Sequence, residues 1–192
     1  MSELIIRDVV AEDIATITAI YREAVLHGTA SFELDPPDEA EMLMRMEAIK
    51  DVGFPYIVGV DANNTLLGYA YANTFRSRPA FRWCIENSVY IDDKAQGQGI
   101  GGKLMAELIA RCTQLGFRQM VGVIGGGVEH RASIRLHEKL GFNHIGIMPA
   151  TGFKHGKWLD SVFMQLSLGE GADTDPDLDA YPGTLYRQKT KP

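Results

Sequence analysis

The segment that most constrains this chain is a glycine-rich turn, Gln96-Gly97-Gln98-Gly99-Ile100-Gly101-Gly102-Lys103. A strand-like run, 82–91, precedes it and apolar residues at helical spacing follow it, so we expect a strand, the turn and a helix in succession. A turn without side chains exposes main-chain N–H groups at the positive end of a helix dipole, which suits a phosphate. The segment therefore predicts an anion-binding strand–turn–helix unit within an α/β fold.

Other interpretations of this turn agree less well with the residues around it. Three of its glycines satisfy G-x-G-x-x-G, but a dinucleotide fold also needs an acidic residue at the end of the next strand, and no acid follows that strand before Glu129. The turn also fits a P-loop, except that Leu104 stands where Mg²⁺ needs Ser or Thr. A turn that only permits close helix–strand packing is the remaining alternative.

The composition narrows the class of protein. With 192 residues, 45% of them hydrophobic, the chain is long enough for one domain with its own core. Its 25 acidic residues outnumber 19 basic ones, which argues against a general nucleic-acid or anionic-membrane binder. No apolar run approaches the roughly 18 residues of a membrane span, and the start lacks the pattern of a secretory signal. Cys84 and Cys112 lack disulfide or metal spacing, so we expect a cytoplasmic protein without a metal.

The hydrophobic periodicity predicts an α/β (α+β) domain over residues 1–168. Helices are expected around 14–25, 38–49, 104–115 and 132–140, and strands around 4–6, 56–60, 65–72, 82–91, 119–124, 142–148 and 159–166. The strand at 119–124 should run parallel to that at 82–91, because a helix connects them. The last segment, 169–192, is acidic and poor in apolar residues, so we interpret it as a tail that is flexible or packs on a partner subunit.

Two motifs together resemble the GNAT N-acetyltransferase superfamily. Gln96-x-x-Gly99-x-Gly101 is similar to the loop that holds the coenzyme A pyrophosphate there, and Leu136-His137-Glu138-Lys139-Leu140-Gly141-Phe142 is similar to a later L-Y/H-x-x-x-G-F segment. The resemblance covers residues 4–167. It implies a mixed central sheet of about six to seven strands flanked by about four helices, with splayed central parallel strands.

Four blocks resemble one subfamily in particular, the phosphinothricin and methionine sulfoximine/sulfone N-acetyltransferases. They are Tyr21 with Thr29-Ala30-Ser31-Phe32-Glu33, Glu86-Asn87-Ser88-Val89-Tyr90-Ile91, Ser133-Ile134-Arg135-Leu136-His137-Glu138, and Gly152-Phe153-Lys154-His155-Gly156-Lys157-Trp158-Leu159-Asp160. This resemblance implies a homodimer that moves the acetyl group of acetyl-CoA directly to the primary amine of a small amino-acid-like acceptor. The alternatives are an acetyltransferase for peptide or protein amines and a catalytically silent acyl-CoA-binding sensor.

The resemblance also assigns roles to individual residues. Glu86 is the general base, in a partly desolvated site that would raise its pKa, and His137 is an acid or proton relay. The structural alternatives are an edge-strand Glu86 that faces water or pairs with Arg82, and a His137 that is hydrogen-bonded in the interior. The coenzyme-binding residues are expected to be Val89, Tyr90, Ile91, Gln96, Gly97, Gln98, Gly99, Ile100, Gly101, Gly102, Ser133 and His130, the last of which stands where the subfamily usually has Asn.

Acceptor recognition needs a cation for the α-carboxylate and an apolar slot for the side chain. The residues expected to supply them are Phe32, Arg76, Arg78, Arg82, Asn87 and Ser88. An isolated arginine is more often simply solvated, so we expect about one of the three to touch the acceptor. Lys154, His155 and Trp158 are expected either in the acceptor pocket or a dimer contact, or in a tight hairpin before the last strand.

Overall fold

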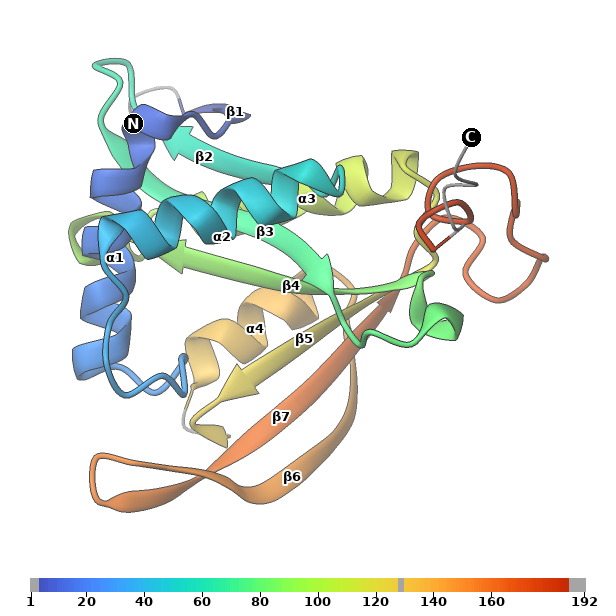
Figure 1. The fold of residues 1–192 in the computed structure, drawn as a ribbon. Coiled ribbons are helices and arrows are strands. Elements are labelled where there is room, and N and C mark those ends of the chain that lie inside the picture. Colours follow the sequence, from blue (N-terminus) through green and yellow to red (C-terminus); the bar gives the residue numbers. More distant parts are fainter. Residues whose placement is uncertain (1–3, 128–129, 187–192) are drawn as a thin grey trace.

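The computed structural model describes residues 4–127 and 130–186 (Figure 1). They form one seven-stranded sheet in the order β1-β2-β3-β4-β5-β7-β6. The strands are β1 (Ile5–Asp8), β2 (Tyr56–Val60), β3 (Leu66–Thr74), β4 (Cys84–Ile91), β5 (Gln119–Gly125), β6 (Asn143–Lys154) and β7 (Lys157–Ser167). The α-helices are α1 (Ile14–His27), α2 (Glu39–Asp51), α3 (Ile100–Gln114) and α4 (Arg131–Lys139). The predicted order of elements is confirmed.

The central pair of strands, β4 and β5, is parallel and separates halfway along its length. Pairing runs from Cys84 opposite Gln119 to Asn87 opposite Gly122, after which each strand continues without pairing to the other. On its other edge, β4 stays bonded to β3 as far as Ile91. The expected splay is therefore present, and it leaves the β5-facing main-chain edge of 88–91 open (Figure 1).

Alternation along β4 sends successive side chains to two different helical layers. Tyr90 contacts Tyr21 of α1, with ring centroids 5.1 Å apart. Asn87 donates a hydrogen bond to Met105 of α3 on the opposite face. Glu86 and Ser88 share the face of Tyr90, so they lie on the side of the sheet that α1 covers.

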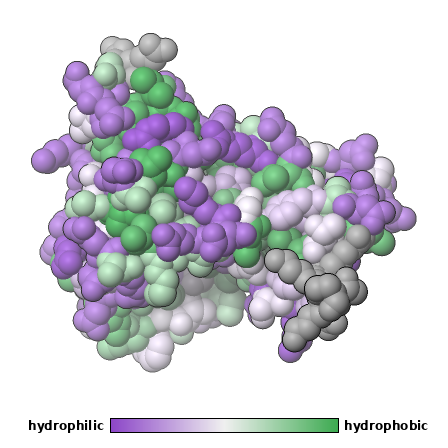
Figure 2. All heavy atoms as spheres, turned by 45° about the horizontal axis from the view of Figure 1, so that its top comes forward, coloured by the Kyte–Doolittle hydropathy of each residue, from purple (hydrophilic) through white to green (hydrophobic). Residues whose placement is uncertain are grey.

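Local signals account for the helices. The Asp38 carboxylate caps α2 by accepting a hydrogen bond from the Glu41 N–H at 2.8 Å, as the capping-box pattern predicts. The buried side of α3 carries the stripe of Leu104, Leu108 and Cys112. On the face shown in Figure 2, hydrophilic side chains dominate and hydrophobic ones lie between them. Across the described part of the chain, no helix is long and apolar enough to cross a membrane.

The last two strands are longer than the hydrophobic pattern predicts. β6 continues past Met148 through an irregularity, at which Ala150 has a positive φ of 52°, and resumes pairing at Gly152. The sequence Pro149-Ala150-Thr151-Gly152 carries the residues of a turn, which is why the strand was expected to end there. The hairpin instead turns at His155 and Gly156, both with positive φ, as a two-residue loop requires.

The segment 169–186 packs on its own chain, and this corrects the expected tail. The ring of Tyr181 contacts Phe54 and Phe117, and its hydroxyl donates to the Val52 carbonyl. Arg118 donates to Thr174 in the same segment at 2.9 Å. The surface on which Tyr181 and Leu185 pack is the core of this same chain and not that of a partner subunit. The remainder of the expected tail, 187–192, lies outside the described residues.

Candidate active site

The glycine-rich turn lies where α3 begins, beside the open end of β4. Gly97 and Gly99 have φ of +75° and +78°, and a Cβ added at either would meet nothing within 4 Å. Glycine is therefore favoured there by backbone conformation and not by crowding. A Cβ added at Gly101, in the first turn of α3, would lie within van der Waals reach of Ile91 on β4 and Leu136 on α4, so this turn of the helix packs close to both elements.

This arrangement fits a ligand with a phosphate end and an extended amide-containing arm. The first-turn N–H groups of an α-helix have no partner within the helix, and the helix dipole favours an anion beside them. The open main-chain edge of 88–91 can form strand-like hydrogen bonds with such an arm. His130 and Ser133, both half-buried, begin α4 beyond the end of β5.

Glu86 lies in the middle of the sheet. It belongs to β4, between β3 and β5, so the alternative of an edge-strand glutamate is wrong. Burial raises the pKa of its carboxyl. Among the residues that the structure describes, no ion pair joins Glu86 to Arg82, so the alternative of that pair is not supported. A carboxylate with a raised pKa is suited to accept a proton near neutral pH.

Two polar residues of β3 lie beside Glu86 on the same face of the sheet, and they are not among the candidate site residues expected from the sequence. Asn73 of β3 stands directly opposite Glu86, and Tyr71 stands opposite Ser88. Burial raises the pKa of Tyr71, and the nearby Glu86 charge adds a smaller increase. The alternation of residues along β3 already predicts that Tyr71 and Asn73 share one face of the sheet. That this face lies beside Glu86 follows only from the register between β3 and β4.

His137 and Asn87 lie on the other face of β4 and bond to each other. They are 2% and 6% exposed. His137 Nδ1 donates to the Ser133 carbonyl at 2.8 Å, and its Nε2 accepts from Asn87 Nδ2 at 3.0 Å. Burial lowers the pKa of His137, so the imidazole is neutral at pH 7. Both ring nitrogens are thus engaged in the interior, which favours the structural alternative for His137.

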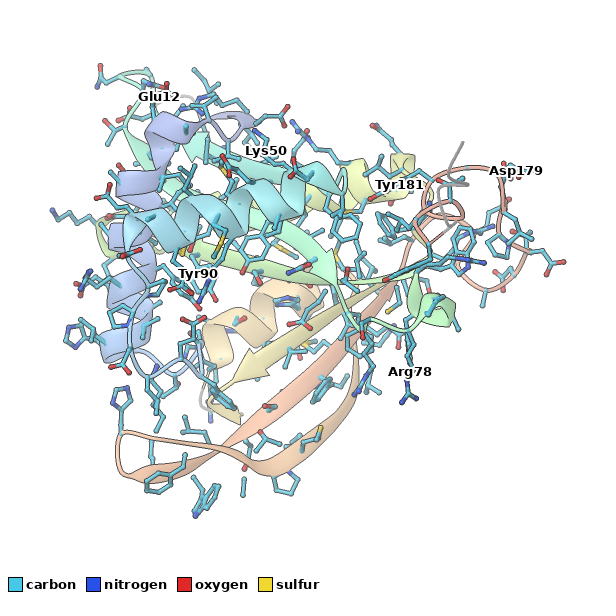
Figure 3. The ribbon with its side chains drawn as sticks, viewed as in Figure 1. Glu12, Lys50, Arg78, Tyr90, Asp179 and Tyr181 are labelled. Carbon is cyan, nitrogen blue, oxygen red and sulfur yellow. The ribbon has the colours of Figure 1, made fainter. Side chains whose placement is uncertain are left out.

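The three candidate arginines differ in their surroundings. Arg76 and Arg78 are exposed, and Figure 3 shows Arg78 pointing outward from the connection between β3 and β4. Arg82 is half-buried, with its Cζ 5.5 Å from the centre of the Trp83 ring. Its Nε is buried and has no hydrogen-bond partner among the described residues. Arg82 is therefore the arginine best placed to serve a ligand.

Within residues 4–127 and 130–186, no group of three or more His, Cys, Asp or Glu is arranged to hold a metal ion.

Comparison with known proteins is consistent with this geometry. The model of the acetyltransferase (GNAT) family matches residues 17–142. A phosphinothricin N-acetyltransferase from Alcaligenes faecalis is 44% identical over 173 residues, which are 90% of this chain and 85% of the relative. An L-methionine sulfoximine/L-methionine sulfone acetyltransferase from Pseudomonas paraeruginosa is 41% identical, over 85% of this chain and 94% of the relative.

A solved structure is similar to this chain over nearly its whole length. It is a GNAT superfamily phosphinothricin acetyltransferase from Sinorhizobium meliloti in complex with acetyl-CoA. It is 53% identical, has a TM-score of 0.93, and the alignment covers 97% of this chain and all of that one. The expected fold class is confirmed by this agreement.

Proposed function

This chain belongs to the acetyltransferase (GNAT) family, and from that premise we propose that it acetylates the primary amine of a small amino-acid-like acceptor with acetyl-CoA as donor. The two relatives that are 44% and 41% identical act on phosphinothricin and on methionine sulfoximine or sulfone, which supports this acceptor class. The observation that carries the proposal is Glu86, a half-buried carboxylate with a raised pKa beside the open edge of β4.

The donor would be held mainly by main-chain groups. The N–H groups of 96–102 suit its diphosphate, and the open edge at Val89, Tyr90 and Ile91 suits its pantetheine arm. Acetyl-CoA supplies the acetyl group as an activated thioester. A main-chain N–H near Tyr90 or Ile91 would polarise the thioester oxygen as negative charge develops on it. His130 and Ser133 would contact the coenzyme from the start of α4.

Glu86 would act on the acceptor amine. An aliphatic amine is mostly protonated at pH 7, so a proton must leave before the nitrogen can attack. Glu86 accepts that proton, directly or through a water molecule. After the acetyl group has moved to the nitrogen, the coenzyme A thiolate leaves and is protonated to the thiol. Arg82 would pair with the acceptor carboxylate, and Phe32 and Ser88 would line the slot for its side chain. His137 would position Asn87 at the point where the strands separate.

The test is a thiol-release assay with acetyl-CoA and a panel of acceptors. We expect turnover of phosphinothricin, methionine sulfoximine, methionine sulfone or an ordinary α-amino acid, and none of peptides. Turnover of peptides alone would replace this acceptor class with peptide or protein amines. Binding of acetyl-CoA by calorimetry, together with no turnover of any amine, would identify a sensor instead.

We also propose that the enzyme is a homodimer built on the outer strands. β6 is the edge of the sheet, and large apolar side chains are exposed on it and on β7: Ile145 55%, Ile147 51%, Met148 51%, Phe153 57% and Trp158 67%. A long exposed apolar edge strand invites pairing with another chain. Both cysteines are free thiols, so the contact would be noncovalent, as suits a reducing cytoplasm.

Substitution of one of these residues tests the dimer. Ile147→Lys should convert the dimer to a monomer in sedimentation analysis, because a lysine would be placed in the apolar contact. Met44→Lys is the matched control, since Met44 is 62% exposed on α2 and distant from β6 in the fold. A wild-type monomer, or a dimer that Ile147→Lys leaves intact, would disprove this interface.

A further inference from the structure

The connection between α1 and α2 reaches across the split in the sheet. Its first part, 28–33, leaves α1 and lies against the ends of β5 and of the hairpin formed by β6 and β7 (Figure 1). A Cβ added at Gly125 of β5 would lie 2.5 Å from the Thr29 carbonyl oxygen. The segment therefore bridges the two halves of the molecule that flank the splayed strands.

Phe32 is clamped between two glycines of that second half. A Cβ added at Gly125 would lie 2.8 Å from its ring, and one added at Gly152 of β6 would lie 2.6 Å from it. Such distances are shorter than real Cβ contacts, so both positions need glycine for the ring to fit. Because packed interiors transmit displacement, the position of Phe32 depends directly on these strands.

Lys154, the last residue of β6, contacts the same segment, 28–33. It is only 4% exposed, and its Nζ donates to the Ser31 carbonyl at 2.8 Å. Burial lowers the pKa of Lys154, and the Glu33 carboxylate offsets part of that decrease. His155 Nε2 donates to the Gly28 carbonyl at 3.1 Å. A buried ammonium costs free energy to desolvate, so this contact constrains the segment strongly.

The segment is held equally firmly on the α1 and α2 side. The Tyr21 hydroxyl donates to Glu33 at 3.0 Å and shares a hydrogen bond with Ser31 at 2.9 Å. Glu33 also pairs with Arg45 of α2 at 2.7 Å. Tyr21 contacts Tyr90, which lies on the same face of β4 as Glu86, four positions further along the strand. Movement of the segment at Lys154 would thus alter the space beside the proposed base.

We propose that Lys154 is a positioning residue for the acceptor: it fixes Phe32 as a rigid wall and so sets the width of the acceptor slot. The inference rests on the proposed function, in which Phe32 lines that slot. The proposed donor site consists of 96–102, the open edge of β4, and His130 and Ser133 at the start of α4, whereas the Lys154 ammonium donates to the Ser31 carbonyl. Lys154 should therefore affect the binding of the acceptor and leave the binding of the donor unchanged.

The first test replaces Lys154 with methionine, which keeps the length and removes the donor. Lys154→Met should raise the KM for the acceptor about tenfold, which corresponds to one lost hydrogen bond from a charged group. The Kd for acetyl-CoA and kcat should change less than twofold. Lys157→Met is the matched control, because Lys157 is exposed in the same hairpin. A merely structural role would lower stability and impair both substrates together.

A second pair of variants moves Phe32 without touching Lys154. Gly152→Ala would press a methyl group against the ring, whereas Gly146→Ala on the same strand would meet nothing within 4 Å. We expect Gly152→Ala to change the acceptor KM and the preference between small and bulky acceptors, and Gly146→Ala to match the wild type. This pair decides the question even if Lys154→Met fails to fold.

The outcomes separate this inference from the function on which it rests. If the wild type turns over amino-acid acceptors and both Gly152→Ala and Lys154→Met keep its acceptor KM, the inference is wrong and the function stands. An equal rise in the Kd for acetyl-CoA would also overturn it. If the wild type acetylates none of these acceptors, the proposed function fails, and the assignment of Lys154 fails with it.

Discussion

The two ends of the β4–β5 pair differ sharply. At the end where the strands begin, they are hydrogen-bonded to each other, and the segment 169–186 packs nearby through Tyr181 and Arg118. At the other end they separate, main-chain groups and glycines with positive φ surround the opening, and Glu86 stands at its edge, one position before the last pair. The proposed donor groups thus lie where the sheet gives up pairing, whereas Arg82 precedes β4 at the paired, closed end.

The largest effect should come from removing the base at the open end. Glu86→Gln keeps the shape of the side chain but cannot accept the amine proton, so kcat should fall about 10²–10⁴-fold. The Kd for acetyl-CoA should not change, because the donor contacts are main-chain groups. Steady-state kinetics and calorimetry check both quantities. Nearly wild-type turnover would assign the base to another residue.

The stability of Glu86→Gln relative to the wild type should increase as the pH rises. Burial raises the pKa of Glu86 in the folded state, so the folded protein binds its proton more tightly than the unfolded chain does. Its contribution to stability is therefore present at low pH and lost as the pH rises through that pKa. The Tm of Glu86→Gln relative to wild type should increase from acid to neutral pH. A constant difference would contradict the desolvated carboxyl.

The closed end should respond in the opposite way, with a loss of stability and no change in chemistry. Tyr181→Ala removes a half-buried ring from Phe54 and Phe117 and should lower the free energy of unfolding by about 2–3 kcal/mol. The kcat and both KM values, measured well below the Tm, should stay at wild-type values. Tyr186→Ala, at a 38% exposed position of the same segment, is the control. A catalytic defect in Tyr181→Ala would show that the two ends are coupled.

A smaller effect is expected for the turn at the open end. Gly99→Ala places a side chain at φ +78°, at a cost of about 1–2 kcal/mol, and should also weaken acetyl-CoA binding because the turn relaxes. Gly156→Ala has a similar φ of +74° and open space, but lies in the hairpin. It should lose similar stability and keep the wild-type Kd, as calorimetry would show. Equal Kd values for the two variants would remove the turn from the donor site.

The smallest effect concerns His137, on the face of β4 opposite Glu86. Burial lowers its pKa, so its contribution to stability is present above the unfolded value near 6.5 and is lost as the pH falls through the folded pKa. Between pH 7 and pH 5, the Tm of His137→Gln should therefore fall by less than the Tm of the wild type. Identical slopes would mean that folding leaves the pKa of His137 unchanged.

Much of the fold followed from local pattern. The helical stripe of Leu104, Leu108 and Cys112, the Asp38 cap and the alternation along β4 each depend on residues near one another in the chain, and the structure confirms them. The direction of the Glu86 pKa also followed, because its sequence neighbours are apolar. The length of β6 could not be predicted from local pattern, because its turn-forming residues form an irregularity within the strand, after which β6 continues to pair with β7.

The sequence by itself determined the order of elements, the phosphate-type turn and the face of β4 that carries Glu86, because periodicity and backbone preference act over a few residues. Tertiary structure alone decided that Arg82 is partly buried whereas Arg78 is exposed. It also decided that Asn87 is hydrogen-bonded to His137 and that the Tyr181 ring packs at one end of the sheet. These contacts join residues about 50 or more positions apart, and loop closure makes any one of them a weak consequence of local sequence.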